Sequence, residues 1–135
     1  MSRSGYSDDC EMNWDLIRWR GAVKSAIRGK RGQAFLREML EALDSMPDKV
    51  LAESVLEQDG DVCAMGAVGV KRGLDMSKVD PFERVEVAQL FGISEALAAE
   101  IAYENDEGVW GANETPTARW TRMRKWVVSQ ISEKL

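Results

Sequence analysis

The sequence predicts a mainly α-helical, compact single-domain fold of five or six helices. Apolar residues recur at three- and four-residue spacing over most of the chain, and capping residues and glycines separate those stretches. With 135 residues, 44% of them hydrophobic, the chain can bury a core without metal or disulfide support. The polar residues 1–12 are expected to form a loose segment, and a single helical domain is expected to span 13–135.

The first predicted helix begins at Asn13 or Asp15 and runs to about Arg28, with its apolar residues on one face. Glycines then interrupt the pattern on either side of Lys30-Arg31. A second helix is predicted over about 33–46, stopping at a proline. A short glycine loop between neighbouring helices favours an antiparallel hairpin.

The stretch 49–63 is the only part of the chain typical of β structure. Asp59-Gly60 before a β-branched residue is a turn signal, so a small two-stranded ribbon is expected there. The small residues that follow predict a short, tightly packed helix from Cys63 to about Lys71, which Gly73 ends.

Three further helices complete the predicted fold. One covers about 82–90 and ends at Gly92, and the next is capped by Ser94 and runs to about residue 104. Thr115-Pro116 is a strong helix start, because a capping hydroxyl precedes a proline at the first helical position. The inner face of this last helix is expected to carry Trp120, Met123, Val127 and Ile131.

Charge is distributed unevenly along the chain. Positions 18–37 hold seven basic residues and no acidic one, whereas positions 38–118 hold eighteen acidic residues against five basic ones. The net charge is −5. A positive segment in an acidic protein indicates a charged partner more directly than it indicates any chemistry.

Five basic residues are therefore the candidate binding residues: Arg20, Lys24, Arg28, Lys30 and Arg31. The first three recur every four residues and form a stripe on one flank of the first helix. The other two lie in the glycine loop before a helix N-terminus, where a phosphate or carboxylate would be stabilised. The alternative is that the stripe pairs with carboxylates of the same chain.

Several kinds of site are disfavoured by composition. The chain has no histidine and two cysteines, which excludes a Ser-His-Asp triad and a Cys-His pair and leaves no ordinary zinc site. Cys63 is interpreted as a core residue, the alternative being a nucleophile at a helix N-terminus. No metal and no cofactor are therefore expected.

The same composition bears on location. Cysteines too few for a disulfide framework suit a reducing cytoplasm, although one bridge between Cys10 and Cys63 stays an alternative. The chain starts without an apolar secretory signal and has no long apolar run, so a cytoplasmic protein that does not enter a membrane is expected.

A third candidate region contains Asn105, Asp106 and Trp110. These residues could form the polar edge and aromatic wall of a small-ligand pocket. The alternative is an asparagine that caps the end of the preceding helix and a loop tryptophan folded onto the core.

The stretch Ile17-Arg18-Trp19-Arg20-Gly21-Ala22-Val23, continued by Ser25-Ala26-Ile27-Arg28-Gly29-Lys30-Arg31-Gly32-Gln33-Ala34-Phe35-Leu36, resembles a family of small proteins from tailed phages and prophages to which no activity is assigned. The segments Ser2-Arg3-Ser4-Gly5-Tyr6, Val62-Cys63-Ala64-Met65-Gly66-Ala67 and Tyr103-Glu104-Asn105-Asp106 fit the same family. The resemblance implies a phage-encoded accessory protein acting in the host cytoplasm, and it assigns no catalytic residue.

The leading hypothesis is accordingly a non-enzymatic protein that binds a host or phage protein, for example as an inhibitor of a host factor or of a host defence. One alternative is nucleic-acid binding through residues 18–37, although a pI of about 4.9 weakens it. A second alternative is the binding of a small anion or nucleotide at the glycine loop. The sequence leaves the oligomeric state open.

Overall fold

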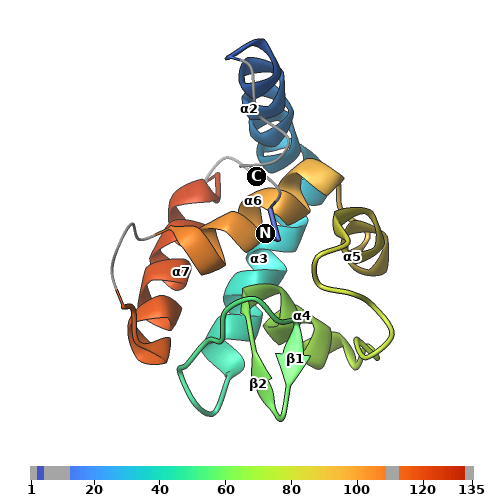
Figure 1. Cartoon of the computed structure of the whole chain (residues 1–135). Helices are drawn as coiled ribbons and strands as arrows, with labels where there is room; N and C mark the ends of the chain where they lie inside the picture. Colours follow the sequence, from blue (N-terminus) through green and yellow to red (C-terminus); the bar gives the residue numbers. More distant parts are fainter. Residues whose placement is uncertain (1–2, 5–12, 109–112, 133–135) are drawn as a thin grey trace.

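The computed structural model describes residues 3–4, 13–108 and 113–132, and only the backbone of residues 13–16. The predicted mainly helical fold with a small ribbon is confirmed (Figure 1). The described part contains six helices, α2 (Asn13–Arg28), α3 (Lys30–Ser45), α4 (Ala64–Arg72), α5 (Arg84–Phe91), α6 (Glu95–Glu107) and α7 (Pro116–Gln130), and two strands, β1 (Glu57–Gln58) and β2 (Asp61–Val62).

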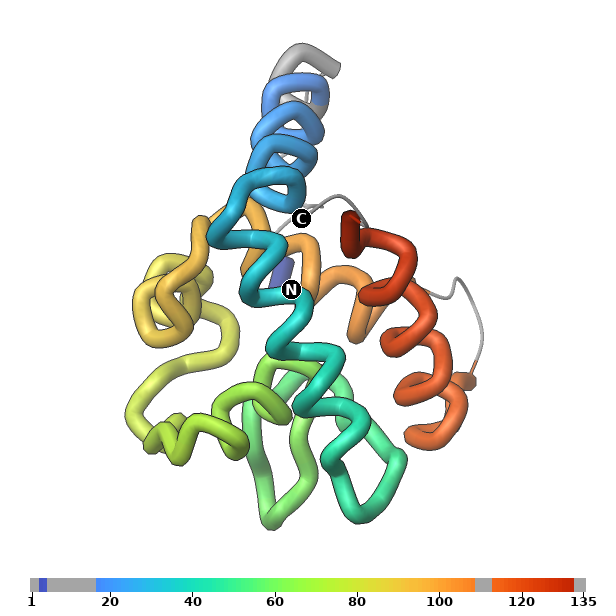
Figure 2. The backbone as a smooth tube through the Cα atoms, turned by 180° about the vertical axis from the view of Figure 1, so that it is seen from behind, coloured from blue at the N-terminus to red at the C-terminus, as the bar shows by residue number. Residues whose placement is uncertain are grey.

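Helix α3 runs through the middle of the molecule and packs against α4 and α7, while α6 contacts α2, α4, α5 and α7 (Figures 1 and 2). The apolar faces of these helices meet in one core, as their three- and four-residue spacing predicts. The largest fully buried side chains of this core are Leu36, Met39, Leu43, Leu51, Met65, Val68, Phe91, Leu97, Ile101, Met123 and Val127.

Helix α2 projects from the body, and the backbone of its N-terminal end extends beyond the other helices (Figures 1 and 2). Its inner face carries Val23, which is buried, and Trp19, Ala26 and Ile27, which are half-buried. Trp19 also touches the body, since the Arg84 guanidinium of α5 (Arg84–Phe91) lies 5.5 Å from the centre of its ring, whereas the opposite face of α2 is left to solvent.

The predicted antiparallel hairpin of the first two helices is wrong. Only Gly29 separates α2 from α3, and the chain bends there and continues instead of turning back (Figure 2). The hydrogen bonding is almost continuous, since Gly29 N donates to Ser25 O at 3.1 Å and Gln33 N donates to Gly29 O at 2.9 Å. A reversal needs a loop of about two to five residues, which one glycine does not supply.

Helix α3 also begins three residues earlier than predicted, so Lys30 and Arg31 lie in its first turn and not in a loop. Gly32 does not break the helix. It lies so close to the carbonyl oxygen of Ala26 that a Cβ at position 32 would collide with that backbone. Glycine at this position allows the last turn of α2 to pack on the first turn of α3.

The two-stranded ribbon forms at the predicted turn. Asp59 and Gly60 have φ angles of 54° and 88°, and Glu57 pairs with Val62. The first strand is limited to residues 57–58, although single hydrogen bonds continue before it: Ala52 N donates to Val62 O at 2.8 Å and Cys63 N donates to Leu56 O at 3.4 Å. Leu51 N instead donates to Pro116 O at 3.1 Å.

The predicted helix caps at Ser94 and Thr115 are confirmed, each side chain accepting a hydrogen bond from a backbone N–H of the first turn. Cys63, predicted as the first residue of its helix, caps α4 in the same way. The left-handed glycines Gly73 and Gly92 end α4 and α5 as predicted. Every helix in the described ranges is too short or too polar to span a bilayer.

Candidate functional site

The five predicted binding residues lie on two consecutive helices, along α2 and in the first turn of α3. Arg20, Lys24 and Arg28 are on α2 and follow one another at intervals of about 6 Å along the helix axis. Lys30 and Arg31 open α3 directly after the bend. All five side chains are exposed, and together they are called the basic surface below.

No residue of the basic surface forms an ion pair with a carboxylate in the described part of the chain. The ion pairs found there engage other basic residues: Arg3, Lys71, Arg72, Arg84, Arg119, Arg122 and Arg124. The alternative in which the stripe is neutralised by the same chain is therefore wrong for the described residues. The positive charge faces solvent.

The Glu104 carboxylate interacts electrostatically with Arg20 of the basic surface without forming an ion pair. Burial raises the pKa of Glu104 on α6, and the nearby charge of Glu100 adds to the rise. The charges of Arg122 and Arg20 oppose the shift without cancelling it. Glu104 therefore moderates the field at the Arg20 end of the basic surface without pairing with it.

The start of α3, which carries Lys30 and Arg31, has no acidic side chain of its own. Gly29 is its N-cap and offers no side-chain acceptor, and no acidic residue stands in its first turn. The backbone N–H groups at a helix N-terminus carry a partial positive charge that a carboxylate usually offsets. Here no side chain of the first turn offsets it, and the last carbonyl groups of α2, such as that of Ala26, lie against it instead.

An apolar side chain accompanies the charges. Ile17 is 64% exposed, the largest exposed fraction among the large hydrophobic residues in the described ranges. On a helix, Ile17 lies on the same side as Lys24 and Arg28. The outward face of α2 is therefore both basic and partly apolar.

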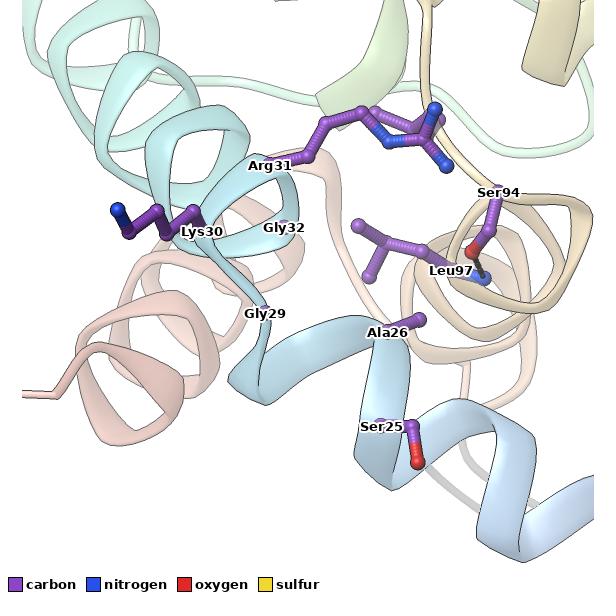
Figure 3. Close-up of a pocket in the computed structure, with 9 residues that line it drawn as sticks. Ser25, Ala26, Gly29, Lys30, Arg31, Gly32, Ser94 and Leu97 are labelled. Carbon is purple, nitrogen blue, oxygen red and sulfur yellow. Dashed lines mark hydrogen bonds between the residues drawn. The ribbon is translucent and has the colours of Figure 1, made fainter.

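Beside the bend lies a pocket of about 240 Å³ between the end of α2, the start of α3 and the start of α6. Ala26, Ile93 and Leu97 supply its apolar side chains, while Gly29 and Gly32 leave its α3 side open. In Figure 3 the Arg31 side chain reaches across the pocket toward Ser94, whereas Lys30 points the other way. Arg31 is thus the cation that faces the pocket.

Helix α6, which borders the pocket, is capped by Ser94, a residue that also lines the pocket. Ser94 Oγ accepts a hydrogen bond from Leu97 N at 3.1 Å (Figure 3). The pocket has an apolar floor of Ala26, Ile93 and Leu97 and one guanidinium at its mouth, and its lining also includes Ser25, Ser94 and the two glycines. Such a lining suits a group that has an apolar body and a negative charge.

The region around Asn105 and Asp106 serves a different purpose. Helix α6 continues to Glu107, so Asn105 is a buried residue within the helix and does not cap its end. Its side chain accepts a hydrogen bond from Ala64 N at 3.1 Å and donates to Ala52 O at 2.9 Å. Asn105 thereby joins α6 to the start of α4. Trp110, the third residue of the predicted pocket, lies outside the described residues.

Asp106 binds Arg3, which the sequence did not single out. Arg3 is buried and donates from Nε and Nη2 to the two carboxylate oxygens at 2.6 and 2.7 Å. Burial raises the pKa of Asp106, but the hydrogen bonds and charge of Arg3, with a hydrogen bond from Ser54 N, hold it below its usual value. Arg3 and the buried Ser4 are thus anchored and not loose.

Cys63 belongs to the same buried network. Its Sγ atom accepts hydrogen bonds from Gly66 N at 3.4 Å and from Arg3 Nη1 at 3.5 Å, and the side chain is fully buried as a free thiol. The cavity beside Arg3 measures about 10 Å³, which leaves room for no more than a water molecule. The network therefore holds the N-terminal residues, α4 and α6 together and offers no space for a substrate.

No group of three or more Cys, Asp or Glu residues in the described ranges could hold a metal ion. Comparison with known proteins adds no assignment: no family model, curated protein or solved structure matches this chain. The case for a function consequently depends on the basic surface and the pocket beside it.

Proposed function

We propose that this protein binds an acidic protein partner through the basic surface and that binding, not catalysis, is its activity. The resemblance to tailed-phage proteins gives the proposal its setting, in which the partner is a host or phage protein in the bacterial cytoplasm. A host factor or a host defence protein would be inhibited by such contact.

One observation carries the proposal: five exposed cations follow one another along α2 and the start of α3 in an acidic protein, and no described carboxylate forms an ion pair with any of them. Like charges four residues apart on a helix cost roughly 0.2–0.5 kcal/mol per pair. The spacing of Arg20, Lys24 and Arg28 creates two such pairs. A partner with negative charge would remove this cost.

A protein fits this surface better than a nucleic acid does. The exposed Ile17 and the apolar floor of the pocket favour a partner that supplies apolar side chains as well as carboxylates. A nucleic acid would also meet repulsion from a chain of net charge −5.

The test compares two double variants with the same change in net charge. Lys24→Glu with Arg28→Glu alters the basic surface, whereas Lys78→Glu with Lys125→Glu alters exposed lysines elsewhere. Each immobilised protein is exposed to bacterial lysate at physiological salt, before and after nuclease treatment. We expect the wild type and the Lys78/Lys125 variant to retain the same protein, and the Lys24/Arg28 variant to lose it.

Two results would contradict the proposal. Equal retention by both double variants would show that the basic surface is not the binding site. Retention that disappears after nuclease treatment, together with a salt-sensitive gel shift, would identify a nucleic acid as the partner.

A further inference from the structure

The pocket beside the basic surface has the size of a single side chain. Its volume of about 240 Å³ is below the range of about 300–1,000 Å³ that pockets for drug-sized ligands occupy. A nucleotide, with base, sugar and phosphates, would project well beyond it. One apolar side chain with part of its backbone is a better match.

The lining defines the chemistry of the occupant. The methyl group of Ala26 and the side chain of Leu97 point into the space, and Arg31 extends over it (Figure 3). No described residue pairs with Arg31, so its guanidinium is available to a carboxylate. An apolar group below and an acidic group at the mouth would satisfy both parts of the lining.

We infer that this pocket receives one apolar side chain of the acidic partner, while a carboxylate next to it in the partner's chain binds Arg31. The inference rests on the proposed function and names the feature that selects the partner. The basic surface would attract many acidic peptide segments. The pocket would select the segments that carry an apolar residue next to their acidic residues. Arg28, which stands between the lining residues Ala26 and Gly29 in the chain, extends the contact.

The probe is a short synthetic peptide of Asp, Glu and Gly with one central Leu, compared with the same peptide carrying Ser in place of Leu. Both peptides have the same charge, so a difference in affinity reports the apolar contact alone. Fluorescence anisotropy at physiological salt should show the Leu peptide binding roughly tenfold or more tightly than the Ser peptide.

A pocket-filling variant tests the location. Ala26→Leu places extra side-chain volume in the pocket, and we expect it to remove the preference for the Leu peptide while leaving the weaker binding of the Ser peptide. Ala22→Leu is the matched control, because Ala22 is exposed on the same helix one turn earlier and does not line the pocket. It should keep the preference.

A second measurement needs no variant. In the wild-type chain, the methyl NMR signals of Ile93 and Leu97 should shift on addition of the Leu peptide and not of the Ser peptide, whereas those of exposed Val128 on α7 should not move. Equal affinity for the two peptides, or unmoved Ile93 and Leu97 signals, would overturn this inference and leave binding at the basic surface intact. Failure of both peptides to bind would overturn the proposed function as well.

Discussion

The arginines of α7 and those of the basic surface differ in how their charge is used. Arg119 is buried, donates to Leu51 O at 3.0 Å and lies 3.5 Å from a Glu114 oxygen. Arg122 donates to the same carboxylate at 2.7 Å and to Glu104 O at 2.6 Å. These arginines connect helix ends and loops within the molecule.

The basic surface makes no such connections among the described residues. Its members stand on the outer side of α2 and at the start of α3, although positions 38–118 alone supply eighteen acidic residues. The difference is one of position, because α2 projects away from the elements that carry most of those acids (Figure 1). Arginines therefore stabilise the fold where several elements meet. On the projecting helix α2 their charge stays available to a partner.

The largest effect should come from breaking a paired arginine. Asp106→Ala leaves the guanidinium of Arg3 buried without its carboxylate, and we expect unfolding free energy to fall by about 3–5 kcal/mol. Arg28→Ala on the basic surface should change it by less than about 0.5 kcal/mol. Urea unfolding of the two variants measures the difference. Similar losses would show that the two classes of arginine are not distinct.

Glu114→Gln should lower the unfolding free energy by a smaller amount. The Glu114 carboxylate serves both Arg122 and Arg119, and its side chain is only 11% exposed. Replacing the charge weakens the hydrogen bonds from Arg122 and removes the ion pair with Arg119, so we expect the unfolding free energy measured in urea to fall by about 1.5–3 kcal/mol. A loss below that range would mean that the carbonyl acceptors alone hold the two guanidinium groups.

The paired carboxylates also predict how stability depends on pH. Arg122 lowers the pKa of Glu114, and Arg3 outweighs burial to lower that of Asp106. The unfolded chain then binds protons at these groups first, near pH 4, so their stabilisation is present above that pH and is lost as pH falls through the lower folded-state pKa values. Thermal unfolding from neutral pH to about pH 3 should show this loss, and Asp106→Asn should reduce its slope. An unchanged slope in that variant would contradict the assignment.

The smallest effect on the unfolding free energy should be an increase. Lys24→Gln removes the repulsion with both Arg20 and Arg28, so we expect the folded state to gain about 0.4–1 kcal/mol. The same variant should bind the partner less well. Stability and binding would then respond in opposite directions, as expected where charge is retained for function. Destabilisation in chemical unfolding would show that Lys24 has a structural contact after all.

Local sequence signals predicted the helices well. The caps at Ser94 and Thr115 and the stops at Gly73 and Gly92 depend on residues within one turn of the helix end, so they could be read directly. The prediction that Gly32 breaks the helix was wrong, because the role of this glycine is not set by its neighbours within one turn. Its role depends on how closely Ala26 approaches it, which no local pattern reveals.

The candidate site was predicted in part. Its five residues follow from charge and helical spacing, but the pocket needs Ile93, Ser94 and Leu97, which come from α6 and the residue before its cap, far away in sequence. The pairing of Arg3 with Asp106 spans 103 positions and was missed for the same reason. The sequence predicts Asn105 and Asp106 as a polar pair, but their hydrogen-bond partners lie in segments that only folding brings near.

The sequence by itself determined the helical class, most helix ends, the turn of the ribbon and the concentration of positive charge, because each depends on neighbours along the chain. Tertiary structure alone decided that α2 projects, that its cations stay unpaired among the described residues and that a pocket opens beside Arg31. Those outcomes depend on which segments meet in space, and a carboxylate eighty residues away neutralises an arginine only if the fold brings the two together.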